Sequence, residues 1–200
     1  MTEEGLEVTA ETASALAALH RSSLPVSVLG RMGRSTLERY YRWVGRSPLE
    51  QLFLARDDRS LVGAAVVSLR PASLLRRFVG DAPVRFAAEA AAAFVRDAAF
   101  RRDVRAFLFE SGDNAGSEQP EVLQVFVAAP ARGRQTGTAL LQRVEDWLRA
   151  RHLGRYCVRT LAEDNASTLG FYARRGFQTA GERRFCGERY LVLEKSVAER

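Results

Sequence analysis

Apolar and polar residues follow two periods along this 200-residue chain, and each period predicts one kind of element. Helices are predicted where apolar residues recur every three or four positions, in segments 10–19, 35–44, 83–100, 137–151 and 165–175. Strands are predicted where short runs are rich in Val, Leu and aromatic residues, in segments 6–9, 51–56, 61–69, 121–127, 156–161, 177–181 and 189–193. The order of these elements and the chain length predict a single mixed α/β domain covering residues 1–200.

Turn and cap residues refine these boundaries. Ser35, with Glu38 three residues later, forms a capping box that predicts the start of a helix. Segment 24–32 contains proline and glycine and is predicted to be a loop. The polar link at residues 57–60 joins two β-rich runs, which predicts a hairpin. Gly176 follows the last helical segment and can adopt the left-handed conformation of a helix C-cap.

Residues 70–120 contain no clear strand and separate the predicted hairpin from the next strand. Within them, segment 83–100 is helical in pattern, and segment 111–119 is polar and predicted to be an exposed loop. Eight arginines and four acidic residues lie between Arg70 and Arg105, so this segment carries much of the net charge of +6. We therefore expect a basic helical insertion.

The composition excludes several classes of protein. No apolar run is long enough for a transmembrane helix, and the acidic N-terminus lacks the basic region of a secretory signal, so we expect a cytoplasmic protein without membrane contact. Two cysteines and two histidines are too few for a disulfide framework or a histidine-rich site, so no metal is expected. Arginine makes up 29 of the 30 basic residues, which fits a phosphate-bearing partner or a coding bias toward arginine codons.

One strand–turn–helix segment has the features of a phosphate site. The apolar strand 121–127 enters a short loop that holds two arginines and a glycine and opens directly into helix 137–151. Amides of a first helical turn have no intrahelical partner and lie at the positive end of the helix dipole. Those of residues 134–139 can therefore converge on an anion. The same segment would also fit an ordinary connection in which the glycines serve only the turn.

With this loop the chain resembles the GNAT N-acetyltransferases, whose Gln/Arg-x-x-Gly-x-Gly/Ala loop binds the pyrophosphate of acetyl-CoA. Arg132 matches the first position of that loop, and Gly137 matches the last. Gln135 stands where the family usually has its middle glycine. A side chain there could crowd the pyrophosphate or demand another local backbone conformation.

The following segments match the family as well. Asn165 comes after the next strand, the pair Phe171-Tyr172 ends the helix after it, and a Gly-Phe turn follows. The resemblance spans residues 122–177 and implies an α/β (α+β) fold with a mixed, mostly antiparallel central sheet, splayed strands and flanking helices. It places the insertion at residues 70–120 near the acceptor cleft, as a helical lid.

The resemblance implies that acetyl-CoA is the co-substrate. The residues that match cofactor-binding positions of the family are Val125, Phe126, Val127, Arg132, Gly133, Arg134, Gln135, Thr136, Gly137, Thr138, Asn165 and Tyr172. In the family, free backbone groups of the splayed strand pair with the pantetheine arm and can steady charge on the thioester oxygen, which implies this role for Val125 and Val127. Asn165 matches the residue that hydrogen-bonds the arm. Tyr172 matches a catalytic tyrosine beside the sulfur, and a phenol with a pKa of about 10 can donate to the departing thiolate.

The identity of the general base is open. A primary amine has a pKa of about 10.4, so a base must remove its proton at neutral pH. Glu121 matches the position of the catalytic glutamate in histone-modifying members of the family, and it could equally be a solvent-exposed acid at a strand end. Glu110, Glu163 and Asp164 are further candidates for binding a cationic acceptor.

Six residues are expected to be structural rather than catalytic. Helix-surface positions are expected for His20 and His152, and buried positions are expected for Cys157, Cys186, Trp43 and Trp147.

These features predict an acetyl-CoA-dependent N-acetyltransferase in which a small-molecule primary amine attacks the thioester directly. The basic insertion favours an acidic or phosphorylated acceptor, although an arginine-rich exposed helix is often only solvated. Two alternatives stay open: a GNAT-like aminoacyl transferase that uses aminoacyl-tRNA, which clustered arginines would suit, and a non-catalytic CoA-binding module. A homodimer is possible by analogy with relatives.

Overall fold

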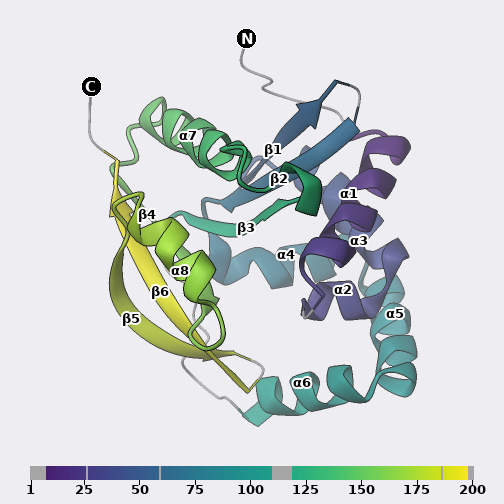
Figure 1. Cartoon of the computed structure of the whole chain (residues 1–200). Coiled ribbons are helices and arrows are strands. Elements are labelled where there is room, and N and C mark those ends of the chain that lie inside the picture. Colours follow the sequence, from purple (N-terminus) through teal and green to yellow (C-terminus); the bar gives the residue numbers. More distant parts are fainter. Residues whose placement is uncertain (1–7, 26, 59, 110–118, 186, 198–200) are drawn as a thin grey trace.

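The computed structural model describes residues 8–25, 27–58, 60–109, 119–185 and 187–197. Within these residues, six strands form one sheet in the order β1-β2-β3-β4-β6-β5 (Figure 1). The strands are β1 (Glu50–Asp57), β2 (Ser60–Ser68), β3 (Glu121–Val127), β4 (Arg155–Leu161), β5 (Gln178–Phe185) and β6 (Glu188–Ser196). The helices are α1 (Ala10–Ser23), α2 (Val28–Met32), α3 (Arg34–Arg46), α4 (Leu74–Asp81), α5 (Pro83–Arg96), α6 (Ala98–Phe109), α7 (Thr136–Arg149) and α8 (Ala166–Ala173). The predicted mixed α/β fold is confirmed.

The sheet is antiparallel except between β3 and β4, and that parallel contact is short. Only Glu121 and Val122 of β3 pair with β4, after which the two strands diverge (Figure 1). A β-bulge accompanies the divergence, because Val67 of β2 lies opposite Val122 whereas Val66 lies opposite Gln124. The predicted splayed sheet is therefore present, and β3 has an unpaired edge from the bulge onward.

Two hydrophobic clusters cover the two faces of the sheet. On one face, α1 and α3 pack on alternate residues of β1, β2 and β3, such as Val66 and Phe126. On the other face, α7 and α8 pack on the intervening residues, such as Val67 and Val122. Trp43 belongs to the first cluster and is buried as predicted, and the second cluster contains Trp147, whose predicted burial is also confirmed.

The N-terminal helices differ from the prediction in detail. Segment 24–32 is not entirely a loop, because the Ser27 side chain accepts a hydrogen bond from the Gly30 amide and α2 begins at Val28. Ser35 is not the N-cap of α3, because that helix begins at Arg34 and its N-cap is Gly33, with a φ of 115°. Of the predicted strand 6–9, only residues 8 and 9 are described, and neither is in a strand.

The insertion contains three helices where one was predicted. Asp97 has extended backbone angles and separates α5 from α6. Its carboxylate accepts hydrogen bonds from the amides of Ala99 and Phe100, at 2.8 and 3.1 Å, and so begins the next helix. The predicted loop 111–119 lies outside the described residues except for Gln119. None of the described helices has the length and apolar content needed to traverse a membrane.

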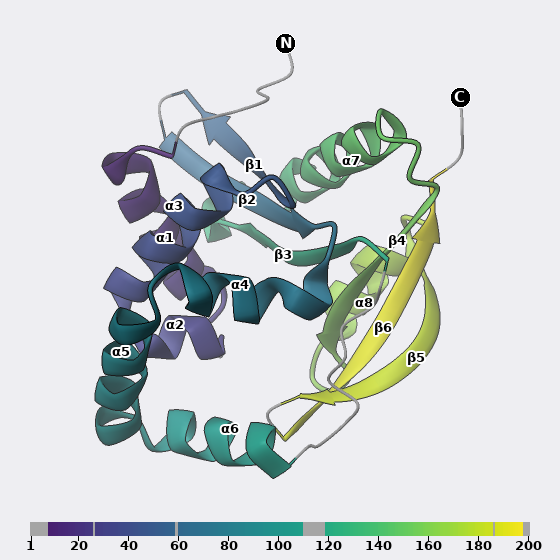
Figure 2. The ribbon, with the colours of Figure 1, turned by 180° about the vertical axis from the view of Figure 1, so that it is seen from behind.

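The insertion connects the two diverging halves of the sheet. From the end of β2, it runs through α4 and α5 to α6, which lies beside the tip of the β5–β6 hairpin (Figures 1 and 2). There Arg102 forms an ion pair with Glu188 at 3.9 Å. A Cβ atom at Gly187 would lie 3.6 Å from that of Ala106. The helical character of the insertion is thus confirmed, and its role as a lid stays a prediction.

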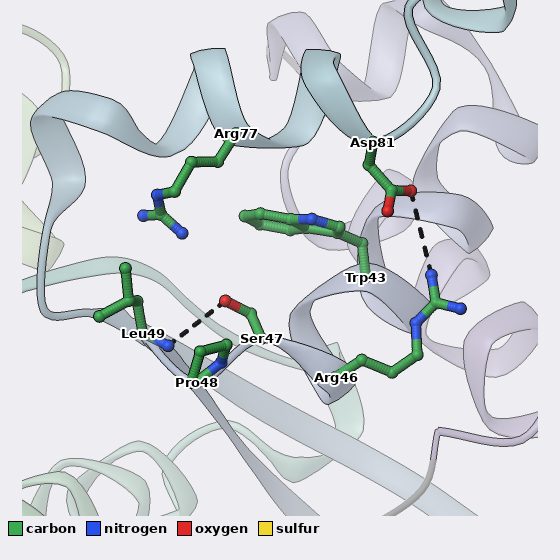
Figure 3. A pocket seen from close by; sticks show the side chains of 7 residues that line it. All are labelled: Trp43, Arg46, Ser47, Pro48, Leu49, Arg77 and Asp81. Carbon is green, nitrogen blue, oxygen red and sulfur yellow. Dashed lines mark hydrogen bonds and ion pairs between the residues drawn. The ribbon is translucent and has the colours of Figure 1, made fainter.

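A cavity of about 290 Å³ lies where α4 crosses the end of α3 and the beginning of β1 (Figure 3). Beside it, the fully buried carboxylate of Glu50 accepts two hydrogen bonds from Arg77 and one from Ser68, each 2.7 Å long, and a further one from Ser47. Burial opposes ionisation of Glu50, but these hydrogen bonds and the charge of Arg77 outweigh it and hold its pKa below the usual value. The ion pair fixes α4 to the sheet.

Replacing Arg77 with Met should lower the free energy of unfolding by about 3 kcal/mol, because the Glu50 carboxylate would stay buried without a counterion. The difference from the parent should shrink in acid, since stabilisation from a carboxyl with a lowered pKa is lost as the pH falls through that pKa. Urea unfolding measures both effects. In the control Arg46→Met, the lost pair with Asp81 is exposed and 3.9 Å long, so the change should stay within about 0.5 kcal/mol. Equal losses in the two variants would contradict the prediction.

Candidate functional site

The unpaired edge of β3 is the first component of the site. The Ala128 amide donates to the Val62 carbonyl of β2 at 2.8 Å. Because successive residues of a strand direct their backbone groups to opposite sides, Gln124 and Phe126 also face β2, whereas Val125 and Val127 face the gap beside β4. Within the described chain, neither the Val125 amide and carbonyl nor the Val127 amide has a hydrogen-bond partner. The edge can therefore receive an extended molecule that carries amide groups.

The loop between β3 and α7 is the second component. Gly133 and Gln135 both have a positive φ, 77° and 62°, and α7 starts directly after Gln135. The six amides of residues 133–138 form no hydrogen bond to any described part of the chain. They lie at the positive end of the α7 dipole, so this loop has the donors and the polarity of an anion site.

Gln135 keeps the backbone conformation that a glycine would adopt there. Its φ and ψ of 62° and 7° are left-handed, and the side chain is exposed. For a residue with a Cβ atom this conformation costs on the order of 1 kcal/mol. The loop thus keeps this left-handed turn at a residue with a side chain, at the expense of local strain.

Gly137 has a packing role that the sequence did not reveal. A Cβ atom there would lie 3.3 Å from the Phe171 ring and 3.8 Å from the Val127 side chain. The glycine therefore allows the first turn of α7 to approach α8 and the end of β3 closely.

The two loop arginines are exposed, and each has a partner. Arg132 donates from Nε to the Val127 carbonyl at 3.0 Å, and Arg134 lies 3.9 Å from the Asp57 carboxylate. Both pairs are solvent-accessible and weak, so the positive charges stay available beside the loop amides.

Tyr172 lies at the end of α8 and packs between two phenylalanines. Its ring centroid is 5.2 Å from that of Phe171 and 5.0 Å from that of Phe177, and the residue is 7% exposed. Burial raises the pKa of its hydroxyl to about 12, so the group is protonated at neutral pH. The hydroxyl makes no hydrogen bond among the described residues, and it is not one of the polar atoms sealed from solvent. It is therefore free to donate to a bound molecule.

Asn165 is held at the end of β4. Its Nδ2 donates to Thr160 Oγ1 at 2.6 Å and to the Leu161 carbonyl at 3.0 Å. These two hydrogen bonds use both N–H groups of the amide and orient the side chain, whereas Oδ1 accepts no hydrogen bond from the described residues. The oxygen is thus the atom that can receive a hydrogen bond from a ligand amide.

Glu121 is buried, so the expectation of a solvent-exposed acid at a strand end is wrong. The residue is 2% exposed, and its Oε1 accepts a hydrogen bond from Arg159 Nε at 2.6 Å. The second oxygen, Oε2, is sealed from solvent without a hydrogen-bond partner. Burial raises the pKa of this carboxyl, and the Arg159 charge offsets only part of that effect. An unpartnered buried carboxylate oxygen with a raised proton affinity is suited to accept a proton.

The two candidate catalytic residues occupy opposite faces of the sheet. Tyr172 packs with Val122 in the cluster under α7 and α8. Glu121 precedes Val122 in the same strand and therefore projects to the other face. The structure does not bring the two side chains together, but it places them on either side of the point where β3 and β4 part.

The remaining acidic candidates are less favourably placed. Glu163 is exposed and lies 3.5 Å from Arg189, and Asp164 is exposed with a φ of 51°. Glu110 and Cys186 lie outside the described residues. Cys157 is buried, as expected.

His152 is exposed, but it lies in the turn after α7 rather than on a helix surface.

His20 is completely buried, so its predicted surface position is wrong. Its Nδ1 lies 2.7 Å from the Tyr41 hydroxyl and its Nε2 lies 2.9 Å from Ser27 Oγ, while Tyr41 donates to Gln124 Oε1 at 3.0 Å. Burial lowers the pKa of His20 to about 4, so the ring is neutral at pH 7. The signal was present in the sequence, because His20 continues the buried helical stripe of Ala13, Leu16 and Ala17.

Comparisons with known proteins agree with this geometry. The model of the acetyltransferase (GNAT) family matches residues 15–177. No curated protein matches the sequence.

Solved structures resemble the whole chain at low sequence identity. A protein from Desulfovibrio desulfuricans described as a GNAT-family acetyltransferase is 15% identical, with 96% of each chain covered and a TM-score of 0.62. The ribosomal-protein-S18-alanine N-acetyltransferase of Escherichia coli is 11% identical, with 97% of this chain and 93% of that chain covered and a TM-score of 0.59. The PaiA N-acetyltransferase of Thermoplasma acidophilum, in complex with coenzyme A, is 12% identical over 95% and 96% of the two chains, with a TM-score of 0.53. These likenesses show a shared fold.

Proposed function

Because the chain belongs to the acetyltransferase (GNAT) family, we propose that it transfers the acetyl group of acetyl-CoA to a primary amine of a small-molecule acceptor by direct attack on the thioester. One observation carries the proposal. The unpaired edge of β3 at Val125 and Val127 leads directly into six free amides at residues 133–138. An extended arm with amide groups and a pyrophosphate at its end needs these two features in this order.

The residues present fit acetyl-CoA. Val125 and Val127 would pair with the amides of its arm, Asn165 Oδ1 would accept a hydrogen bond from it, and the amides of residues 133–138 would bind its phosphates. Acetyl-CoA supplies an activated acyl thioester. The similar fold of the Thermoplasma acidophilum enzyme, solved with coenzyme A, supports this choice of co-substrate.

Residues of this chain then accept the proton of the acceptor amine and stabilise the negative charge that develops on the thioester. Glu121 accepts, directly or through water, the proton that the acceptor's ammonium group gives up, and the neutral nitrogen then attacks the acyl carbon. The proton that this nitrogen loses as the amide forms balances the thiolate that leaves. A backbone amide of the β3 edge donates to the carbonyl oxygen as negative charge grows on it. When the carbon–sulfur bond breaks, the Tyr172 hydroxyl donates a hydrogen bond to the thiolate. With a pKa of about 12 it keeps its own proton, so it stabilises the leaving group chiefly as a hydrogen-bond donor.

The proposal is tested by thermal unfolding with acetyl-CoA and by a thiol-release assay over a panel of amines. Acetyl-CoA should raise the melting temperature, because a ligand that binds only the folded state stabilises it. At least one small primary amine should release the free thiol. An unchanged melting temperature would remove the co-substrate from the proposal. Tight, steeply salt-dependent tRNA binding would favour the aminoacyl-transferase alternative instead.

Glu121→Gln should lower kcat/KM by about 100-fold at pH 7, because the amide cannot accept the amine's proton. The loss should shrink as the pH approaches the amine's own pKa of about 10.4, where the acceptor is neutral without help. The parent enzyme's rate should rise with pH through the raised pKa of Glu121, since only the ionised carboxylate is a base. Glu182→Gln on β5, an exposed acid paired with Arg189, is the control and should leave the profile unchanged. No rate loss in Glu121→Gln at any pH would exclude Glu121 as the base.

Tyr172→Phe should lower kcat by about 10- to 100-fold and leave the dissociation constant of acetyl-CoA nearly unchanged. The ring contacts with Phe171 and Phe177 are kept in this variant, and only the hydroxyl is lost. Single-turnover rates and calorimetric titration separate the two quantities. Equal rates in variant and parent would discard the role of the hydroxyl.

A further inference from the structure

A buried chain of hydrogen bonds runs from α1 to the splay and has a defined direction. The Tyr41 hydroxyl gives its one proton to Gln124 Oε1, so its 2.7 Å contact with His20 requires the proton on His20 Nδ1. His20 Nε2 then carries a lone pair and accepts from Ser27, whose oxygen accepts from the Gly30 amide. Every group in this chain of hydrogen bonds is neutral.

The hydrogen bond from Tyr41 determines which end of the Gln124 side-chain amide faces outward. Its oxygen is committed to Tyr41, so the nitrogen with its two N–H groups is the free end. That nitrogen makes no hydrogen bond within the described chain, and it is not among the buried unpartnered atoms. Gln124 is half-buried, which leaves the N–H groups accessible.

The β-bulge decides which face this amide occupies. Leu123 packs against the cluster of α1 and α3, and Gln124 bonds to Tyr41 of the same cluster, so two successive residues point to one face. Without the extra residue, Gln124 would point toward α7 with Val122. The bulge instead places it on the face of Glu121, beside the free backbone groups of Val125.

A positive group shares this face. Arg159 contacts Glu121 through Nε, and its two terminal nitrogens form no hydrogen bond to a described residue. An acceptor whose amine lies between Glu121 and the β3 edge would therefore have hydrogen-bond donors of Gln124 and of Arg159 on its flanks.

We propose that the Gln124 side-chain amide donates hydrogen bonds to an anionic oxygen of the acceptor, a carboxylate or a phosphate, and thereby determines acceptor specificity. Tyr41 and His20 are positioning residues that hold the amide in the donating orientation. This inference rests on the proposed acetyl transfer and adds to it the substrate class: an amine that carries a nearby anionic group.

The test compares acceptors that differ only in the anionic group: glucosamine 6-phosphate against glucosamine, and 4-aminobutyrate against butylamine. Gln124→Met should raise KM for the anionic member of the preferred pair about tenfold, the loss of one hydrogen bond to a charged group. KM for the neutral member, kcat and the acetyl-CoA affinity should stay within about twofold. The two pairs distinguish phosphate from carboxylate. Gln178→Met, a glutamine exposed on β5, is the matched control and should change neither KM.

Tyr41→Phe tests the positioning role. It frees the amide to rotate and should raise KM for the anionic acceptor about threefold in the parent background. In the Gln124→Met background the same change should not raise KM further, because Tyr41 reaches the acceptor only through Gln124, while the lost bond to His20 lowers stability in both backgrounds. An equal rise of KM for the anionic acceptor in both backgrounds would mean that Tyr41 does not act through Gln124, and would refute the positioning role.

Failure of this inference and failure of the proposed acetyl transfer would give different results. If Gln124→Met changes KM equally for both members of each pair, or changes only kcat, Gln124 does not read the anionic group and the inference is wrong. If the parent protein neither binds acetyl-CoA nor releases thiol with any amine, the proposed function fails, and the inference falls with it.

Discussion

The divergence of β3 from β4 creates the open backbone edge around which the candidate site is built. Only two residue pairs join these central strands, and beyond Val122 the backbone edge of β3 that faces β4 is unpaired. Backbone groups without partners destabilise a fold where water is excluded, so an edge kept open between two central strands is a feature that a bound ligand would explain. The free amides of the following loop extend the same surface, and Tyr172 and Glu121 lie on its two sides.

Burial sets the protonation state of each group around the splay. It raises the pKa of Glu121 and of Tyr172 and lowers that of His20. In each case the neutral form is favoured because the charged form loses hydration. The consequences differ with the partners. Glu121 is hydrogen-bonded to Arg159 through one oxygen and has a second oxygen without a partner, which suits proton transfer. Both ring nitrogens of His20 are hydrogen-bonded, so His20 instead helps to orient Tyr41 and Gln124.

The insertion compensates for the sheet's discontinuity. Hydrogen bonds between β3 and β4 hold the two halves together only at one end, and α4 to α6 connect them at another. The buried pair of Arg77 with Glu50 attaches α4 to β1, and contacts of α6 with the β5–β6 tip close the connection (Figure 2). Opening of the splay is therefore limited by helix packing as well as by the sheet itself.

Features that depend only on neighbours in the chain could be predicted from the amino-acid sequence. The bounds of β3, the hairpin of β1 and β2, the helix after the loop and the left-handed Gly176 all follow from local periodicity and turn chemistry. Family motifs also located the loop. Tertiary structure alone decided what depends on distant residues: the burial of Glu121 beside Arg159, the bulge that turns Gln124 toward Tyr41, and the close packing of Gly137 on Phe171. The reason is physical, because a side chain's environment is set by elements that meet only after folding, and no local pattern encodes which of them meet.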